Sequence, residues 1–264
     1  MNLPPRVLII AGSDSGGGAG IQGDIKTATV LGAYAMTAVT GVTVQNTRGV
    51  TRTYPVPPDI VSEQIKSVLT DIGANAIKTG MLVSAEIVKA VADAVRVSPA
   101  PLVVDTVMIA KGGAALLDDS GLDALQTHLF PLADLITPNL PEAERLTGMR
   151  ISSPDAMVVA GEELRKRGAR AVLIKGGHLS TGTVTDVLVT ESGVYRFSGA
   201  RLDNPATHGT GCALATAIAV GLAKQYPLKR AVESARDFVR NAIGAGLAFG
   251  TGTGPINHLY AAKE

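Results

Sequence analysis

The sequence THGTGC, from Thr207 to Cys212, is followed by an uncharged stretch from Ala213 to Ala223. This pattern is typical of a glycine-rich turn that leads into a buried helix. Glycine adopts turn conformations that are closed to other residues, so at Gly209 and Gly211 successive N–H groups can converge at the positive end of the helix dipole. A glycine turn before a helix is just as often only a turn. If it binds an anion, phosphate transfer is the chemistry that it would serve.

Further polar and glycine residues follow short apolar segments that are typical of strands buried on both faces. The predicted strands are Val7–Ala11, Ala76–Lys78, Leu102–Asp105, Ala133–Thr137 and Ala171–Lys175. The residues at their ends are Gly12 to Asp14, Thr79 to Met81, Asp105 and Thr106, Pro138 and Asn139, and Gly176 and Gly177. In open α/β sheets the ligand binds beyond the carboxyl ends of the strands, so we expect these residues to surround one site.

Helical periodicity appears between and after the predicted strands. Apolar residues share one helical face in three stretches, 21–28, 60–72 and 232–242. The alternation predicts an α/β fold with a parallel sheet and helices on both faces. Thr185–Thr190 and Val194–Ser198 flank Ser192 and Gly193 and predict an antiparallel hairpin, so the sheet is expected to be mixed. We expect one domain over residues 1–264.

Composition excludes several classes of protein. The net charge is +1, and the interleaved charges form no basic stripe for nucleic acid and no polybasic patch for a membrane. The apolar run Val7–Ala11 is too short to span a bilayer and leads into glycines rather than a cleavage site, which predicts a cytoplasmic protein. Cys212 is the only cysteine, so an internal disulfide and a cysteine-rich metal cluster are excluded. Small molecules are the expected partners.

A second glycine-rich segment, Gly12 to Gly20, reads GSDSGGGAG and fits neither common nucleotide fingerprint. A P-loop needs Gly-Lys-Ser/Thr, and the dinucleotide fingerprint would need glycine at Ile21. We expect the loop to bring backbone amides close to a ligand, and the helix after it to present Asp24 as a substrate acceptor. An ordinary carboxylate that favours the helix dipole is an equal alternative for Asp24.

Together these segments resemble the hydroxymethylpyrimidine and phosphomethylpyrimidine kinases of thiamine biosynthesis, in the ribokinase-like superfamily. The resemblance covers nearly the whole chain, in the family's order and spacing: IAGSDSGGGAGIQGD from Ile10, VQNTRGV from Val44, KTGML from Lys78, VVDTVM from Val103, LITPNLPEAE from Leu135, IKGGHL from Ile174, THGTGC from Thr207 and GTGPINH from Gly252. VVDTVM departs from the family's common DPVM but keeps the aspartate. The resemblance implies a three-layer α/β domain, usually a homodimer. It also implies transfer of the γ-phosphate of ATP to a hydroxymethyl pyrimidine and then to the resulting monophosphate.

Residues of the types that bind ATP and Mg²⁺ occur in these segments. We expect Lys175 to meet the ATP phosphates, with Thr207 nearby; a salt bridge to a carboxylate is the alternative for the lysine. Asp105, Asn139 and Glu142 are hard oxygen donors that suit Mg²⁺, directly or through its waters. NLPE also matches the superfamily's Asn-x-x-Glu element. By itself this segment could be only a capped helix start.

The resemblance also suggests how the phosphoryl group is transferred. The N–H groups of Gly209, Thr210, Gly211 and Cys212 are expected to surround the migrating oxygens. Cys212 stands where the sugar kinases of the superfamily have an aspartate that takes the hydroxyl proton. A helix N-terminus lowers the pKa of a thiol and an adjacent polyphosphate raises it, so the sequence leaves open whether a thiolate forms.

For the acceptor, Gln45 offers a donor and an acceptor that can pair with an aminopyrimidine edge. Met81, Ala19 and Gly12 would contact the ring, and His208 would support the turn. Two alternatives stay open: a pyridoxal or pyridoxine kinase of the same superfamily, and a sensor that binds a pyrimidine or nucleotide without turnover.

Overall fold

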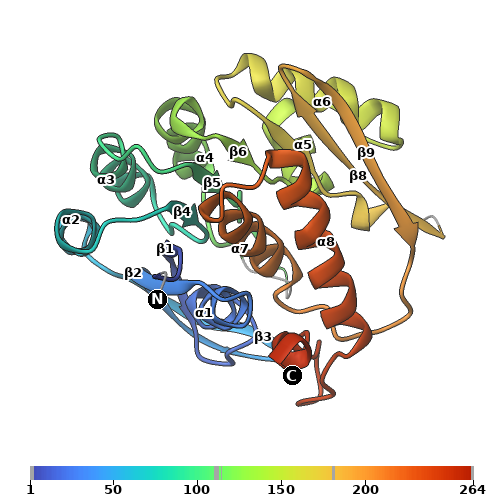
Figure 1. Cartoon of the computed structure of the whole chain (residues 1–264), viewed down its shortest axis with the longest axis horizontal. Coiled ribbons are helices and arrows are strands. Elements are labelled where there is room, and N and C mark those ends of the chain that lie inside the picture. The colour runs from blue at the N-terminus through green and yellow to red at the C-terminus, as the bar shows by residue number, and fades with distance from the viewer. Residues whose placement is uncertain (1–2, 110–112, 114, 180–181, 263–264) are drawn as a thin grey trace.

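The computed structural model describes residues 3–109, 113, 115–179 and 182–262, and one nine-stranded sheet runs through this part of the chain (Figure 1). Its strand order is β3-β2-β1-β4-β5-β6-β7-β8-β9. The strands are β1 (Arg6–Asp14), β2 (Tyr34–Asn46), β3 (Gly49–Pro55), β4 (Ala76–Thr79), β5 (Leu102–Val104), β6 (Leu135–Ile136), β7 (Val172–Ile174), β8 (Thr183–Thr190) and β9 (Gly193–Ala200).

The sheet is mixed, as predicted. From β2 through β1, β4, β5 and β6 to β7 the neighbouring strands are parallel, whereas β3 pairs antiparallel with β2, and β8 with both β7 and β9. All five predicted apolar strands are present, and β8 and β9 form the predicted hairpin. The long β2 and its partner β3 were not predicted. Residues in β2 alternate between buried and more exposed positions instead of forming an apolar run, and only that alternation could have revealed the strand.

Helices form a layer on each face of the sheet, which confirms the predicted α/β fold (Figure 1). One layer holds α1 (Gly20–Val30), α7 (Thr210–Ala223) and α8 (Leu228–Gly244). The other holds α2 (Pro58–Asp71), α3 (Ala85–Val95), α4 (Asp119–Ala124), η1 (Leu125–Leu129), η2 (Phe130–Leu132), α5 (Leu140–Thr147) and α6 (Pro154–Lys166). Short turns η3 (Gly176–His178) and η4 (His258–Ala262) follow β7 and end the described chain. Strand β1 serves both layers, because Leu8 and Ile10 pack into one apolar cluster and Val7 and Ile9 into the other.

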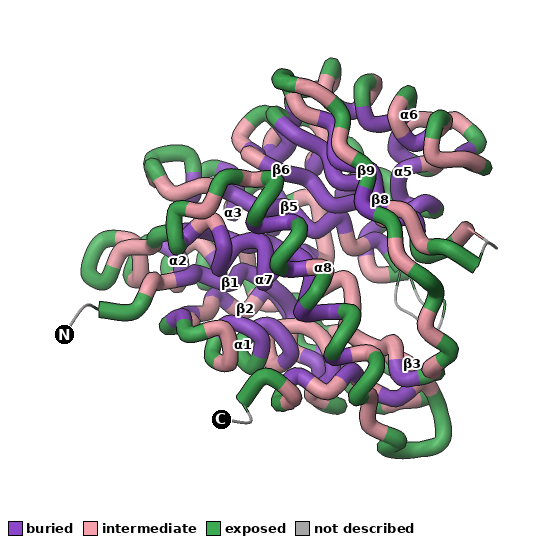
Figure 2. The backbone as a smooth tube through the Cα atoms, turned by 45° about the vertical axis from the view of Figure 1, so that its right-hand side comes forward, coloured by how far each residue is buried: buried purple, intermediate pink, exposed green. Residues whose placement is uncertain are grey.

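Helix α7 is the most enclosed helix of the first layer, as its lack of charge predicts, and Figure 2 shows it in purple beside the central strands. It packs against α1, α8 and strands β1, β4 and β5. In α1 the predicted apolar stripe is only partly buried. Ala28 is buried and Ile21 packs on the same cluster, whereas Ile25 is exposed and Gly23, Asp24 and Thr27 are buried beside them. The first helix therefore turns a partly polar face towards α7.

The strand order reverses next to β1. The chain passes from β1 to β2 on one side and returns to β4 on the other, so the loops after β1 and β4 diverge and leave a crevice at the carboxyl ends of the strands. Among the described residues, none of the helices combines the length and apolarity that a membrane span requires.

Candidate active site

A cavity of about 1060 Å³ opens at the carboxyl ends of the parallel strands. It is lined by residues that follow β1, β4, β5, β6 and β7, and by the first turns of α1 and α7. The predicted site residues that line it are Gly12, Ala19, Gln45, Met81, Asp105, Asn139, Glu142, Lys175, Thr207, Gly209, Thr210, Gly211 and Cys212. The residues singled out from the sequence therefore gather in one place, with the exception of Asp24.

We call Thr207–Cys212 the anion turn, and it starts α7 as expected. Gly209 is the residue before the helix and has φ of 85°, and a Cβ there would lie 1.9 Å from the carbonyl oxygen of Gly18. The turn is closed by the Thr210 hydroxyl, which donates to the carbonyl of Thr207 at 3.2 Å. Gly211 differs from the expectation, since its φ is not positive. A Cβ at Gly211 would stand 3.4 Å from Lys175 Nζ, which is an ordinary contact, so a small side chain fits there.

We call Gly12–Gly20 the glycine loop, and Asp14 organises it. The Asp14 carboxylate accepts hydrogen bonds from the amides of Gly16, Gly18 and Ala19, and its Oδ2 lies 2.9 Å from His208 Nε2. Burial opposes the charge of Asp14, but the contact with His208 and the amide donors hold its pKa below the usual value. Asp14 thus joins the glycine loop to the anion turn. From the sequence we expected Asp14 near the site but did not predict that it links these two segments.

The segment before η4 ties the anion turn to the turn between β2 and β3. The amide of Thr253 donates to the carbonyl of Thr47 at 2.9 Å, in the turn between β2 and β3. The amide of His208 donates to the carbonyl of Gly254, and the amide of Ile256 donates back to the carbonyl of His208. The GTGPINH segment therefore braces the anion turn from behind.

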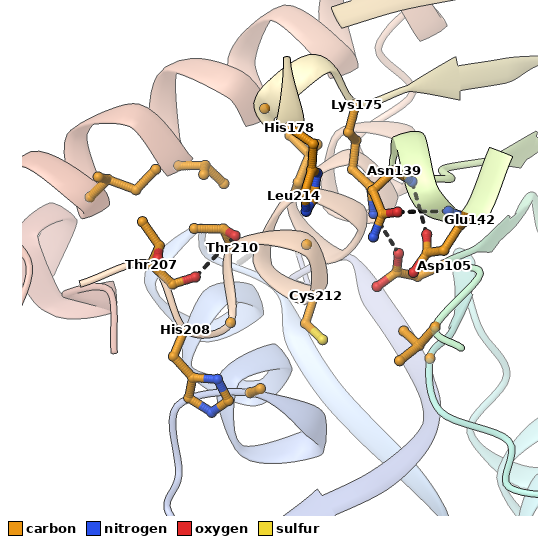
Figure 3. A pocket seen from close by; sticks show the side chains of 18 of the residues that line it. Asp105, Asn139, Glu142, Lys175, His178, Thr207, His208, Thr210, Cys212 and Leu214 are labelled. Carbon is orange, nitrogen blue, oxygen red and sulfur yellow. Dashed lines mark hydrogen bonds and ion pairs between the residues drawn. The ribbon is translucent and has the colours of Figure 1, made fainter. Parts of the chain in front are cut away.

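A charged cluster forms the opposite wall (Figure 3). Lys175 Nζ lies 3.0 Å from Asp105 Oδ1, which also accepts from the Thr137 hydroxyl. Burial works against the charge of Asp105, but the ammonium groups of Lys175 and Lys78 outweigh it and hold the pKa of Asp105 below its usual value. The salt bridge weighed as the alternative for Lys175 is thus present in this structure, and the lysine also lines the cavity.

Asn139 and Glu142 form a capping box at the start of α5, which was the alternative reading of NLPE. Asn139 Oδ1 accepts from the Glu142 amide at 2.9 Å, and Glu142 Oε2 accepts from the Asn139 amide at 2.8 Å and from Thr106. Burial raises the pKa of Glu142, and the charge of Asp105 adds to the rise while Lys175 opposes it. The cap does not exclude a further role, because both residues line the cavity.

The donor set suits Mg²⁺ held jointly with phosphates. Asp105 Oδ2 and Glu142 Oε1 make no hydrogen bond within the described part of the chain, and Mg²⁺ is commonly bound through one or two carboxylates plus substrate phosphates. No group of three His, Cys, Asp or Glu side chains among the described residues is arranged to hold a metal ion. A cation here would therefore depend on ligands from a nucleotide.

Cys212 points into the space between His208 and Asp105 (Figure 3). Its sulfur receives a hydrogen bond from the Gly20 amide at the start of α1. Burial raises the pKa of the thiol to about 12, although Lys78 opposes the rise. Without ligands, burial therefore favours the neutral form of the thiol.

The predicted acceptor residues lie beside the glycine loop. Gln45 Oε1 accepts from the Thr43 hydroxyl at 3.1 Å, and Gln45 Nε2 lies 3.4 Å from His208 Nε2. Met81 packs directly over Gly12, where an added Cβ would stand 2.1 Å from the methionine methyl. The amide of Gln45 and the small apolar surfaces around it thus share one end of the cavity.

Asp24 requires a correction. Its side chain is fully buried and does not line the cavity; Lys78 and Thr216 donate to its two oxygens at 2.6 and 2.7 Å. The prediction that Asp24 accepts a substrate hydrogen bond is wrong, because its carboxylate is buried away from the cavity. The position of Asp24 in the first half of α1 does not by itself determine which way the side chain points. Its partner Lys78 was also missed, since a lysine inside a strand motif carries no signal for burial.

Comparison with known proteins agrees with this geometry. The family model described as phosphomethylpyrimidine kinase matches residues 14–257. The chain belongs to the phosphomethylpyrimidine kinase family. Within the family it is 47% identical over 261 residues to the hydroxymethylpyrimidine/phosphomethylpyrimidine kinase of Streptomyces coelicolor, covering 99% of this chain and 97% of that one. It is 48% identical over 259 residues to thiamine biosynthesis bifunctional protein ThiED of Geobacter sulfurreducens, covering 98% of this chain but only 53% of that protein.

Solved structures of two kinds of kinase are similar to this phosphomethylpyrimidine kinase family member. Bacillus subtilis pyridoxal kinase, solved as an ADP complex, gives a TM-score of 0.91 at 34% identity and covers 99% of this chain and 100% of its own. Phosphomethylpyrimidine kinase from Clostridium difficile gives a TM-score of 0.81 at 39% identity and covers 90% and 99%. The family predicted from the sequence is confirmed, as is the prediction of a kinase.

The two glycines of the anion turn differ in what they tolerate. Gly209→Ala forces a left-handed residue against the Gly18 carbonyl, and we expect it to lower the free energy of unfolding by at least about 1–2 kcal/mol. Gly211→Ala keeps helical backbone geometry and should leave stability unchanged or slightly raised. Urea unfolding of both variants measures the difference. Equal losses would contradict the assigned geometry.

Proposed function

We propose that this protein transfers the γ-phosphate of ATP to the hydroxymethyl group of 4-amino-5-hydroxymethyl-2-methylpyrimidine, and then phosphorylates the monophosphate to the diphosphate. It would do so as a cytoplasmic enzyme of thiamine biosynthesis with one catalytic domain over residues 1–264. The observation that carries the proposal is the position of the anion turn and Cys212 in the same cavity as Gln45, which can pair with an aminopyrimidine edge.

The cavity provides for both reactants. Lys175 and the amides of the anion turn offer positive charge for the polyphosphate, and the turn begins a buried helix whose dipole favours an anion. Phosphoryl transfer passes through a loose transition state, so fixed donors around the migrating oxygens matter more than strong base catalysis. Asp105 and Glu142 would hold Mg²⁺ together with the phosphates, and bound Mg²⁺ would neutralise charge on them.

A pyridoxal kinase is the second candidate. Staphylococcus aureus pyridoxal kinase in complex with AMP-PCP and pyridoxal gives a TM-score of 0.91 at 34% identity. The same anion turn would serve either alcohol. The curated relatives at 45–47% identity that are named hydroxymethylpyrimidine/phosphomethylpyrimidine kinase favour the pyrimidine.

Steady-state kinetics with three acceptors in parallel test the proposal. Hydroxymethylpyrimidine and its monophosphate should each support ADP release that stops on chelation of Mg²⁺, and pyridoxal should have the lowest kcat/KM of the three. A higher kcat/KM for pyridoxal would favour the second candidate. ADP release at the same rate with and without each acceptor would contradict both candidate functions.

Cys212→Ala tests the proposed proton acceptor. We expect ATP and pyrimidine to bind nearly normally while kcat falls about 10²-fold or more, in line with the usual contribution of a general base. Calorimetric binding and steady-state turnover measure the two effects. Cys212→Ser is the control for size, because it keeps a small polar side chain. Turnover of Cys212→Ala at the wild-type rate would remove the sulfur from the mechanism.

Gln45→Leu tests the pyrimidine contact. Loss of the amide strands polar groups of the ligand, so the KM for the pyrimidine should rise about tenfold or more while the KM for ATP changes little. Gln225→Leu is the matched control, since Gln225 is exposed and does not line the cavity. Equal effects on both KM values would argue against the pairing.

The proposal includes a homodimer. The edge hairpin of β2 and β3 exposes Val42, Val44 and Tyr54 to 47%, 57% and 70%, and Val42 lies opposite Tyr54 in the strand register. Apolar side chains at a sheet edge are a surface that pairing with a second copy would cover. Light scattering should give the mass of a dimer, and Val44→Lys should shift it towards the monomer. A monomer in the wild type would contradict this.

A further inference from the structure

The ion pair of Lys78 and Asp24 lies beneath the cavity and takes no part in the function proposed above. Lys78 Nζ donates to Asp24 Oδ2 at 2.6 Å, Thr216 Oγ1 donates to Asp24 Oδ1 at 2.7 Å, and each of the three residues has 0% of its surface exposed. The desolvation of a buried pair commonly cancels its Coulombic attraction, so apolar side chains of similar volume would be as stable. Stability is therefore a weak reason for placing these charges here.

The pair lies one helical turn below the reactive sulfur. Helices α1 and α7 pack against each other, and the first turns of both reach the cavity. The Gly20 amide meets the Cys212 sulfur. Asp24 and Thr216 are each four residues further along their helices, so they form the next contact on the same two faces. Strand β4 packs on α7 and brings Lys78, which is also part of the cavity wall.

Lys78 and a few other charged groups act on the Cys212 sulfur. Burial raises the pKa of Cys212, Lys78 is the strongest influence that lowers it, and Asp24 and Asp105 add to the rise. Lys175 also faces the sulfur, but Asp105 binds it on the far wall. Burial lowers the pKa of Lys78, but the charges of Asp24, Cys212 and Asp105 together raise it above its usual value, so the ammonium does not depend on Asp24 alone for its charge. Water screens such buried charges little.

We propose that Lys78 is a positioning residue for phosphoryl transfer, with its ammonium, fixed by Asp24, acting as the countercharge for negative charge at the Cys212 sulfur. This role rests on the proposed function. In the step concerned, the thiol first loses its proton to solvent, and the resulting thiolate takes the alcohol O–H proton as the alcohol oxygen bonds to the γ-phosphorus. The bond from that phosphorus to the bridging oxygen breaks, and ADP leaves with its electron pair. Lys78 stays protonated throughout.

The test measures the sulfur directly, without turnover. Cys212 is the only cysteine, so its alkylation by iodoacetamide in the nucleotide-free protein can be followed by mass spectrometry. Lys78→Met should lower the alkylation rate about tenfold or more, and Asp24→Asn, which leaves the ammonium without its anion, should raise it by a similar factor. Lys26→Met, which removes an exposed charge from α1, is the matched control and should leave the rate unchanged.

Opposite changes in the alkylation rate of the two variants distinguish an electrostatic role from a purely structural one. A pair that only braces α1 against α7 would change the alkylation rate in the same direction in both variants, and that result would overturn the proposal. If Lys78→Met does not fold, the pH profile of alkylation of Asp24→Asn decides the matter, because a lower pKa of the sulfur shifts the profile whereas greater exposure raises the rate at every pH, and an unshifted profile would overturn the proposal.

A double variant tests whether the two charges matter for turnover. Lys78→Met combined with Asp24→Asn removes both charges, and we expect a folded protein by circular dichroism, an unchanged pyrimidine KM and a low kcat. A wild-type kcat would overturn the proposal. If the wild-type protein phosphorylates no alcohol, the proposed function fails, and opposite alkylation shifts would still assign Lys78 to the control of Cys212.

Discussion

The site depends on the close approach of two backbone segments. Gly209 stands so near the Gly18 carbonyl that no side chain fits between them, and this contact sets the first turn of α7 against the first turn of α1. Asp14 and His208 join the same two segments from the side. Two helix N-termini therefore face one space, which concentrates the positive ends of both helix dipoles where a phosphate is to be held.

The sheet explains why these segments can meet. β1 pairs with β2 on one side and β4 on the other, so the chain leaves the middle of the sheet in both directions and a crevice opens above it. The charged wall of Asp105 and Lys175 comes from strands further along, on the far side of this crevice. The ends of the cavity that we propose bind phosphate and acceptor are thus supplied by different parts of one sheet.

The sequence predicted what depends on local pattern. Apolar runs located the buried strands, and glycines before an uncharged stretch located α7. The gathering of Lys175 and Asp105 followed from the rule that strand ends meet at one edge, whereas Cys212 was assigned to the site through the glycine turn and the family resemblance. Asp24 was misplaced because its environment depends on Lys78 and Thr216, which are distant in sequence. Gly211 was expected to adopt a turn conformation closed to other residues, whereas its φ is not positive and a Cβ there would make an ordinary contact with Lys175.

The bracing of the anion turn by residues 252–257 has a consequence for the order in which the protein matures. The carbonyls of Thr47, Gly254 and His208 link regions from the two ends of the chain through the amides of Thr253, His208 and Ile256. A ribosome releases the glycine loop before the sheet is complete, and this brace only after α7 and α8. A nascent chain can therefore bury much of its core before the anion turn is braced, and the proposed nucleotide site should form only once residues 252–257 have emerged.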